Sequence, residues 1–280
     1  MADTDYVKDK VIIVTGGGGG FGRLIAQQAG ARGAKIVCAD IDAAAAEATA
    51  DLVVAEGGAA LAVRADVTSA AEMAALAETA ADTYGAIDVM INNAGIMPLA
   101  FFADHKAAMG AWHRCLDINI RGVLNGMVAV YDRMMAQGRG HIVNISSIYG
   151  NFPVVGAGVY GATKAAVNFL SESLRMESRG KIKVTLVKPT GVPATGLSAG
   201  VINPAAVVGI VGQNMAEFGA AMEALQGGGL DPAALDPEQA GYLVLDPAFI
   251  AAEVLHAIDR PWGVSVGEVT VRATGDHYLL

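Results

Sequence analysis

Short apolar runs rich in β-branched residues alternate with longer, alanine-rich stretches along most of this chain. The short runs predict strands at residues 11–15, 35–39, 59–64, 87–92, 140–146, 181–187 and 264–272. In the longer stretches apolar residues recur at helical spacing, which predicts helices over 21–32, 43–56, 69–84, 111–136, 158–179 and 247–258. Alternating strands and helices are typical of an α/β fold, and the unbroken apolar strands indicate a sheet covered on both faces. We therefore expect a doubly wound, Rossmann-like parallel sheet.

Glycines mark the expected helix ends, because a helix C-terminus favours a residue that adopts a positive φ. Such residues follow five predicted helical stretches: Gly33, Gly57, Gly85, Gly138 and Gly180. One long segment, about 190–246, breaks the alternation with Pro, Gly and Ala clusters around a weakly helical stretch at 213–226. Long irregular segments in compact domains usually cover a binding site. Since no linker divides the chain, we predict a single domain over 1–280 with this segment as its lid.

Composition and charge limit the partners that the chain is expected to have. Of its 280 residues 53% are hydrophobic and 17% charged, and its net charge is -9. A globular acidic protein repels phosphate backbones and anionic lipid heads, so we expect no nucleic-acid or membrane partner. The start of the chain lacks the pattern of a signal peptide, and no apolar stretch is long enough to cross a bilayer. Cys38 and Cys115 lack CxxC spacing, which predicts buried free thiols and a cytoplasmic location.

A run of adjacent glycines follows the first predicted strand and leads into the first predicted helix. The run begins at Gly16, ends at Gly20 and is followed by Phe21 and Gly22. In this context glycines permit a tight turn, and the N–H groups at the helix start attract a pyrophosphate. Because adjacent glycines leave the register of GxGxxG ambiguous, a flexible turn stays the alternative from this motif alone. A P-loop is excluded, since no Lys-Ser/Thr pair follows the glycines.

Asp40 ends the second predicted strand, where an acid accepts hydrogen bonds from both hydroxyls of an adenine ribose. Its charge would repel the 2'-phosphate of NADP, and neither neighbour, Ala39 or Ile41, is basic. The sequence therefore predicts NAD rather than NADP. The alternative is that Asp40 only caps the next helix, although Asp42 is also placed to do so.

Tyr160 and Lys164 form a YxxxK pair within a predicted helix, on one face and about 5 to 6 Å apart. An ammonium at that distance favours the phenolate, so we expect the tyrosine pKa to fall from about 10 toward a range that suits acid/base catalysis. Alone, YxxxK is a weak signal. Ser147 ends the preceding strand on the same side of the sheet, while alternation along a strand would turn Ser146 to the opposite face. The spacing to Tyr160 favours Ser147.

These features occur together with further motifs: DVT at 66–68, NNAG at 92–95, and Asn119 in DINIRG. With TGGGGGFG at 15–22, NISS at 144–147 and YGATK at 160–164, their order and spacing make residues 8–195 resemble the short-chain dehydrogenase/reductase family. The resemblance implies four catalytic residues. Tyr160 would be the general acid/base, Lys164 would lower its pKa and bind the nicotinamide ribose, Ser147 would orient the substrate oxygen, and Asn119 would hold a water behind the lysine.

The resemblance also implies a set of cofactor-binding residues and no metal. In it Asp66 and Val67 would flank adenine, and Asn93 and Gly95 would line the cleft. The whole set is Gly16, Gly20, Phe21, Gly22, Asp40, Asp66, Val67, Asn93, Gly95, Tyr160, Lys164, Pro189 and Val192. For Asn119 the alternative is simple solvent exposure.

The chain departs from the family after the sixth predicted strand. Thr190 stands where the family usually has glycine, and Thr195 falls one residue late, so the roles of both are open. The lid that follows is apolar and, with crevice residues, predicts a hydrophobic pocket for a bulky, uncharged substrate. These residues are Leu197, Val201, Ile202, Val207, Val208, Ile210, Met215 and Phe218 of the lid, and Ile96, Met97, Pro98 and Tyr149. The alternative is that they pack on the core or on a neighbouring subunit.

The C-terminal sequence GVSVGEVTVRATGDHYLL resembles a branch of the family with VxVxEVxVRxT in its last strand. His256 and His277 show no metal-ligand spacing, so we expect a solvated tail after this strand. The resemblance further implies a homodimer or homotetramer, with the helices of Asn119 and Tyr160 in one interface.

The function we predict is hydride transfer between NAD and a secondary alcohol or ketone. Two alternatives stay open: an NAD-binding redox sensor without catalysis, and an epimerase or dehydratase with the same fold.

Overall fold

Within residues 4–192 and 195–279, which the computed structural model describes, seven parallel strands form one sheet in the order β3-β2-β1-β4-β5-β6-β7. Its strands are β1 (Val11–Thr15), β2 (Lys35–Asp40), β3 (Ala59–Arg64), β4 (Val89–Asn92), β5 (Gly140–Ile145), β6 (Ile182–Pro189) and β7 (Glu268–Val271). The order reverses between β1 and β4, and in such sheets ligands bind beyond the carboxyl ends of the strands at that point. The predicted doubly wound parallel sheet is confirmed.

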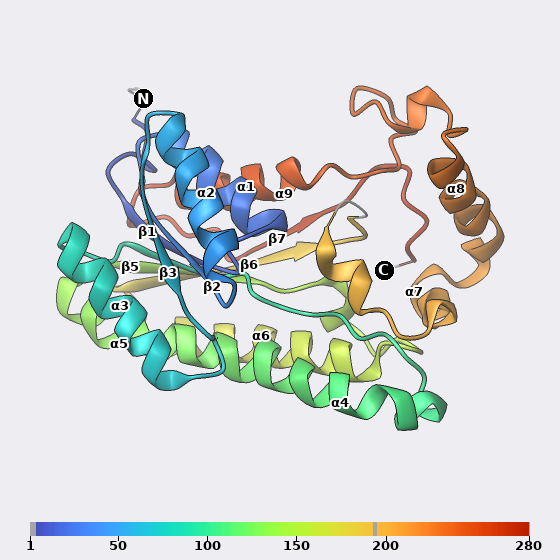
Figure 1. Ribbon diagram of the computed structural model, residues 1–280, viewed down its shortest axis with the longest axis horizontal. Coiled ribbons are helices and arrows are strands. Elements are labelled where there is room, and N and C mark those ends of the chain that lie inside the picture. Colours follow the sequence, from blue (N-terminus) through green and yellow to red (C-terminus); the bar gives the residue numbers. More distant parts are fainter. Residues whose placement is uncertain (1–3, 193–194, 280) are drawn as a thin grey trace.

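Helices cover both faces of this sheet (Figure 1). On one face lie α1 (Gly20–Ala31), α2 (Ala43–Ala55) and α9 (Pro247–Ile258), and on the other α3 (Ala70–Tyr84), α5 (Val123–Gln137) and α6 (Gly158–Glu177), with α4 (His105–Leu116) alongside α6. Each face has its own buried apolar cluster, so the molecule has three layers. Among the described residues, no helix is long and apolar enough to cross a membrane.

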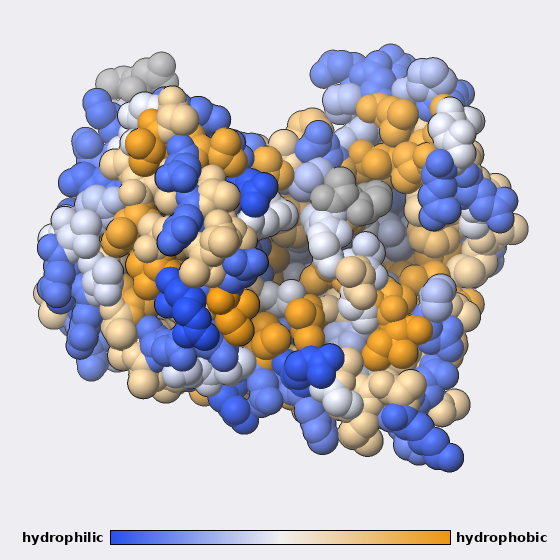
Figure 2. Space-filling view, viewed as in Figure 1, coloured by the Kyte–Doolittle hydropathy of each residue, from blue (hydrophilic) through white to orange (hydrophobic). Residues whose placement is uncertain are grey.

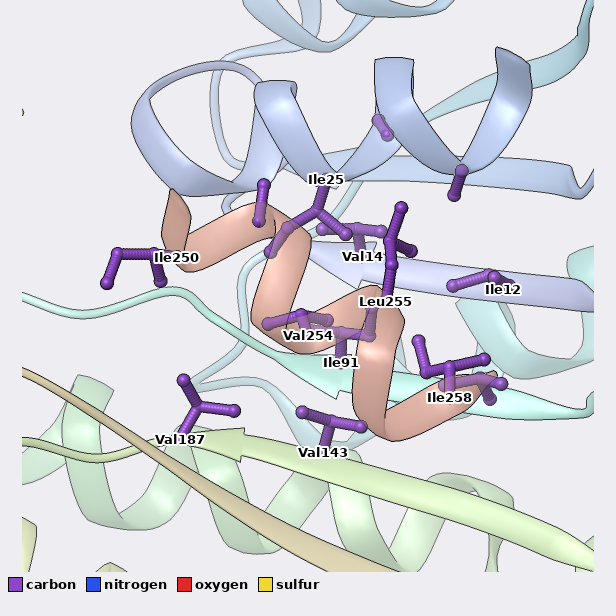
Figure 3. Packing of buried hydrophobic residues seen from close by; sticks show 14 of the residues in the cluster. Ile12, Val14, Ile25, Ile91, Val143, Val187, Ile250, Val254, Leu255 and Ile258 are labelled. Carbon is purple, nitrogen blue, oxygen red and sulfur yellow. The ribbon is translucent and has the colours of Figure 1, made fainter. Parts of the chain in front are cut away.

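Helix α9 illustrates how local sequence and packing agree. Its start is capped by Asp246, whose carboxylate accepts the N–H of Ala248, and Pro247 occupies the first turn. Fully burying one branched apolar side chain contributes about 1.5 to 3 kcal/mol. The helix directs four such side chains toward Val14, Ile91 and their neighbours on the sheet (Figure 3): Ile250, Val254, Leu255 and Ile258.

The glycines predicted at helix ends all have positive φ, between 69° and 87°. Cys38 and Cys115 are free and buried, as predicted. Burial raises the pKa of Cys38 to about 12 and that of Cys115 to about 11, so both stay thiols at neutral pH.

Two predicted elements are wrong in extent. The helix expected over 111–136 begins six residues earlier, at His105, and is interrupted by the π-helical turn Asp117–Gly122 between α4 and α5. Periodicity cannot detect a single wider turn, because the apolar positions on either side keep helical spacing. The strand expected over 264–272 is limited to β7, since only Glu268–Val271 pair with β6.

The segment after β6 and the end of the chain lie together beyond the carboxyl ends of the strands. The short helix α7 (Val208–Val211) and α8 (Met215–Gly227) stand apart from the three layers, and the C-terminus returns to their side of the molecule (Figure 1). The N–H of Leu279 donates to the carbonyl of Ile210 at 2.9 Å, which joins the two segments. The surface is indented between α8 and the side formed by α1 and α2 (Figure 2). Residues 193 and 194 of the predicted lid lie outside the described residues.

Candidate active site

A cavity of about 500 Å³ lies at the carboxyl ends of the strands. It is lined by groups from the glycine turn, from the ends of β2, β4, β5 and β6, from α6, from the lid and from the C-terminus. It brings together most of the predicted site residues: Gly16, Gly20, Phe21, Asp40, Asn93, Gly95, Ser147, Tyr160, Lys164, Pro189 and Val192. Four others, Gly22, Asp66, Val67 and Asn119, are not among its lining residues.

The glycine turn is shaped for a close ligand. Gly16 and Gly20 have φ of +63° and +50°, a region that other residues rarely adopt. A Cβ at Gly19 or Gly20 would meet no atom within 4 Å, whereas one at Gly22 would lie 2.1 Å from the carbonyl oxygen of Gly16. Gly22 therefore lets α1 pack tightly on the turn, while the other two leave the start of the helix open. No side chain caps α1, so its first N–H groups are available to an anion such as a pyrophosphate.

Asp40 faces the cavity from the end of β2. Its carboxylate accepts the N–H of Gly18 at 2.9 Å and that of Asp42 at 3.0 Å, which fixes its position beside the glycine turn. The cap of α2 is Asp42, whose side chain accepts the N–H of Ala45. The capping role that was the alternative for Asp40 is thus filled by Asp42.

Asn93 joins the end of β4 to the glycine turn. Its side-chain amide donates to the carbonyls of Thr15 at 2.9 Å and Gly16 at 3.1 Å, and its own N–H donates to the hydroxyl of Thr15. These bonds cross the point where the strand order reverses, so they set the width of the cleft there.

Asp66 and Val67 do not line the cavity, and their contacts are with the loop after β3 and with the helices beside it. The carboxylate of Asp66 accepts the N–H and the hydroxyl of Thr68. The carbonyl of Val67 accepts the amide of Asn125, and its side chain packs on Gly122 of the π-helical turn. Their described contacts order the loop between β3 and α3.

Tyr160 and Lys164 stand on the face of α6 that borders the cavity. The Lys164 Nζ lies 5.8 Å from the centroid of the Tyr160 ring, and both side chains are buried. The ammonium donates to the carbonyl of Ile145 at 2.8 Å, at the end of β5. This bond anchors the lysine between the sheet and the helix.

The expected lowering of the Tyr160 pKa is wrong for this arrangement. Burial raises the pKa of Tyr160 above its ordinary value, and the hydrogen bond with Ser147 opposes that rise only in part. Burial also lowers the pKa of Lys164 to about 8. Desolvation disfavours both charged forms, and it outweighs the attraction between an ammonium and a phenolate that spacing alone suggested.

Ser147 and Ser146 differ in their partners. The hydroxyl of Ser147 accepts the N–H of Tyr149 and lies close enough to Tyr160 to lower the pKa of that tyrosine. The hydroxyl of Ser146 donates to the side chain of Asn168 at 2.6 Å, away from Tyr160. The preference for Ser147 beside the tyrosine therefore agrees with the geometry.

Asn119 is fully buried in the π-helical turn, so the alternative of solvent exposure is wrong. Its amide oxygen accepts the N–H of Ile96 at 3.0 Å, and its amide nitrogen donates to the carbonyl of Ile96 at 2.9 Å and to the hydroxyl of Thr163 at 3.1 Å. These bonds link the loop after β4 to α6, one turn away from Tyr160. Asn119 thus positions the backbone of Ile96, next to Gly95. Turns of the π-helical type often occur at functional sites.

Thr190 and Thr195 are both in the wall of the cavity. The hydroxyl of Thr190 is buried without a partner among the described residues, and that of Thr195 donates to the carbonyl of Val192 at 3.2 Å. Between them, a Cβ at Gly191 would lie 1.7 Å from the hydroxyl oxygen of Tyr278. Tyr278 therefore packs directly on Gly191, and a side chain at 191 would have to displace the tyrosine ring.

The apolar lid residues divide into two groups. Four of them line the cavity and four do not. The lining group is Leu197, Val201, Val207 and Phe218, joined from the crevice by Met97 and Tyr149. The prediction that the others line it is wrong, because Val208 is exposed and the rest are packed outside the lining: Ile202, Ile210, Met215, Ile96 and Pro98.

The expectation of a solvated tail is wrong. Asp276, His277 and Tyr278 line the cavity, and Tyr278 contacts the ring of Phe218. Sequence reasoning missed these three residues because the search of the tail tested only for metal ligands. The aromatic residue next to the histidine was the available signal, since an aromatic side chain at a chain end has much apolar area to bury.

Comparisons with known proteins agree with this geometry. The family model described as short chain dehydrogenase matches residues 10–204. An uncharacterized oxidoreductase of Listeria monocytogenes serovar 1/2a is 36% identical over 96% of this chain and 98% of its own length.

Two solved structures are similar in fold. A 7α-hydroxysteroid dehydrogenase complexed with NADH and 7-oxo glycochenodeoxycholic acid superposes with a TM-score of 0.78, at 26% identity and 98% coverage of both chains. A metagenomic short-chain oxidoreductase in complex with NADP gives a TM-score of 0.72, at 26% identity, over 96% of this chain and 99% of that one.

The fold and the cavity define a Rossmann-like oxidoreductase of the kind that binds a nicotinamide dinucleotide. The chain belongs to the short-chain dehydrogenase/reductase family. Its structural relatives bind NAD or NADP.

Proposed function

We propose that this protein is an NAD-dependent dehydrogenase that interconverts a secondary alcohol and a ketone, with Tyr160 as general acid/base. The observation that supports this most is a single cavity lined by the glycine turn, by Asp40 and by Ser147, Tyr160 and Lys164. A dinucleotide site and a proton-transfer site therefore share one space.

In this mechanism the bound nicotinamide cofactor supplies or takes up a hydride. Ser147 orients the substrate oxygen by hydrogen bonding. In the reducing direction the hydroxyl of Tyr160 donates its proton to that oxygen, and in the oxidising direction it accepts one. Because burial raises the pKa of Tyr160, the side chain is a phenol and is ready to donate. The nearby ammonium of Lys164 favours the phenolate that donation leaves behind.

The preference for NAD is part of the proposal. Asp40 is fixed at the edge of the cavity, where its charge opposes a 2'-phosphate and its oxygens suit ribose hydroxyls. Among the described lining residues Lys164 is the one Lys or Arg side chain, and it is held by Ile145. Gly22, Asp66 and Val67 act on the cofactor indirectly in this proposal, by shaping the turn and the adjacent loop.

A bulky, apolar substrate suits the remaining part of the cavity. Leu197, Val201, Val207 and Phe218 of the proposed lid, and Met97 opposite, give it apolar walls. A structural relative is complexed with 7-oxo glycochenodeoxycholic acid, which matches the bulk of such a substrate although it also carries an acid group. We therefore place the substrate class among large, uncharged alcohols and ketones.

A homodimer or homotetramer and a cytoplasmic location complete the proposal. Large apolar side chains are exposed on the helices that carry the site, which supports an interface there: Met109, Leu116, Leu124, Val128, Phe169 and Met176. The buried free thiols suit a reducing compartment.

The decisive experiment replaces the phenol and follows NADH. Wild-type protein incubated with NAD and a panel of secondary alcohols should accumulate NADH, and Tyr160→Phe should lower kcat by about 100-fold or more, the contribution typical of general acid–base catalysis. A redox sensor or an epimerase would accumulate no NADH. Near wild-type turnover by Tyr160→Phe, where chemistry limits the rate, would exclude the role of Tyr160.

A further inference from the structure

The last residues of the described chain form a rigid wall of the cavity. Chain ends are usually poorly ordered unless they are tied down. Here the Arg272 guanidinium donates to the carboxylate of Asp276 and to the carbonyl of Tyr278, and the Asn214 amide donates to the carbonyl of His277 at 2.9 Å. We use the name C-terminal tail for residues 276–278.

The C-terminal tail brings polar side-chain atoms into an otherwise apolar part of the cavity. His277 and Tyr278 both pack against Phe218, at ring-centroid distances of 6.3 and 6.2 Å. The Nδ1 of His277 is buried without a hydrogen-bond partner among the described residues. Within the same residues no hydrogen bond uses the hydroxyl of Tyr278. Buried polar groups are normally paired, so the unpaired nitrogen of His277 beside the cavity points to a ligand.

Tyr278 is also near the catalytic tyrosine. Tyr149 is near both: its ring centroid lies 5.6 Å from that of Tyr160, and its pKa is raised mainly by burial and further by its proximity to Tyr278 and Tyr160. The position of Tyr278 against Gly191, just after the end of β6, places it beside the reacting part of the site. When a substrate oxygen bonds to Tyr160, a neighbouring part of the same substrate molecule is therefore within reach of the C-terminal tail.

We infer that His277 and Tyr278 bind a second, uncharged oxygen of the substrate, a hydroxyl or carbonyl distinct from the one that reacts. This inference rests on the proposed function and narrows its substrate class to alcohols and ketones with two oxygen functions. Burial raises the pKa of Tyr278 to about 12, so its phenol is a neutral hydrogen-bond donor. The carboxylate of Glu217 lies 4.0 Å from the Nε2 of His277, and its charge opposes a substrate carboxylate, whereas the carboxylate of Asp276 is paired with Arg272.

The test compares the bicyclic ketone decalone with its monohydroxy derivatives, using variants that remove polar atoms but keep an aromatic ring. Tyr278→Phe keeps the ring on Gly191, and His277→Phe keeps an aromatic ring against Phe218. Each should raise KM and the calorimetric Kd for the best hydroxyketone by about 3- to 10-fold, the effect of one neutral hydrogen bond. Both constants for decalone itself should change less than those for the hydroxyketone, because decalone has no second oxygen to lose a hydrogen bond, and the effect should fall on KM rather than on kcat.

Tyr84→Phe is the matched control, since Tyr84 ends α3 and packs in the cluster on the other side of the sheet. Tyr84→Phe should change neither the KM nor the Kd of either ketone. The inference would be overturned if Tyr278→Phe changed the constants of both ketones equally, or of neither. In that case, turnover of decalone that depends on Tyr160 would still support the proposed function. If no ketone is reduced at all, the proposed function fails, and the calorimetric comparison still decides the role of the C-terminal tail.

Discussion

The two sides of the cavity are built in different ways. On the cofactor side, around the glycine turn, the shape depends on backbone: positive φ at Gly16 and Gly20, and contact of Gly22 with Gly16. On the substrate side the lid and the C-terminal tail depend on side-chain contacts between distant segments, such as Tyr278 on Gly191. The family model ends at residue 204, before α7, α8, α9 and β7. The backbone-defined side lies within the matched region, whereas the opposite side also uses side chains from beyond it, such as those of Phe218 and Tyr278.

The largest expected effect comes from breaking the backbone-defined side. In Gly22→Ala the new methyl would lie 2.1 Å from the Gly16 carbonyl, so α1 and the turn must separate. We expect a loss of about 1 to 3 kcal/mol in the free energy of unfolding, as for other overpacked sites, together with at least a tenfold rise in the Kd of NAD. Thermal melting and calorimetric titration measure the two.

Gly19→Ala is the matched control for stability, because its methyl meets no atom within 4 Å and Gly19 has the extended φ of -165°. It should melt as wild type does. An unchanged melting temperature in Gly22→Ala would contradict the close packing of helix and turn.

Cofactor choice offers the second way to sharpen the comparison. Asp40→Asn keeps an acceptor for the Gly18 N–H but removes the charge. Since hydrogen bonds to charged groups contribute about 1.5 to 3 kcal/mol, the ratio of kcat/KM for NAD to that for NADP should fall by about tenfold or more. Asp42→Ala should leave this ratio unchanged. It should lower the free energy of unfolding by about 1 kcal/mol, because Asp42 caps α2. A ratio unaffected by Asp40→Asn would remove Asp40 from cofactor selection.

The pH dependence of ketone reduction tests the effect of the Lys164 charge, where the cofactor side and the substrate side of the cavity meet. The Lys164 pKa of about 8 means that its ammonium is present below that pH and is lost above it. Tyr160 stays a phenol throughout this range, because burial raises its pKa. The single-turnover rate of reduction should therefore fall about tenfold per pH unit above this pKa, with NADH affinity measured in parallel. A rate that stays flat well into the alkaline range would show that the charge on Lys164 does not assist the reaction.

The smallest expected effect is on the substrate side. Asn214→Ala removes one hydrogen bond to the carbonyl of His277. A single neutral hydrogen bond contributes about 1 kcal/mol, so substrate KM should rise by about 3- to 5-fold, while the Kd of NAD stays constant. A matching change in NAD affinity would show that the two sides are not separate.

Much of the fold was predictable, because its signals are local. Strand positions followed from apolar runs, and helix ends followed from glycines whose positive φ the structure confirms. The π-helical turn at Asp117–Gly122 was not predictable from periodicity, since the groups that bond to its buried Asn119, in Ile96 and Thr163, are distant from it in sequence.

The candidate site was predictable in part, because residues that end parallel strands meet at the same edge of the sheet. Asp40, Ser147, Tyr160 and Lys164 follow strands or lie on a helix beside them, and all line the cavity. The C-terminal tail was missed because its partners, Asn214 and Gly191, are far from it in sequence.

By itself the sequence determined the parallel sheet, the glycine turn and the catalytic candidates on one edge, because periodicity, φ preference and strand direction are properties of neighbouring residues. Long-range packing sets which serine faces Tyr160, makes burial raise rather than lower the pKa of that tyrosine, and brings residues 276–278 into the wall of the cavity. The physical reason is that desolvation and side-chain contact depend on groups brought together from opposite ends of the chain.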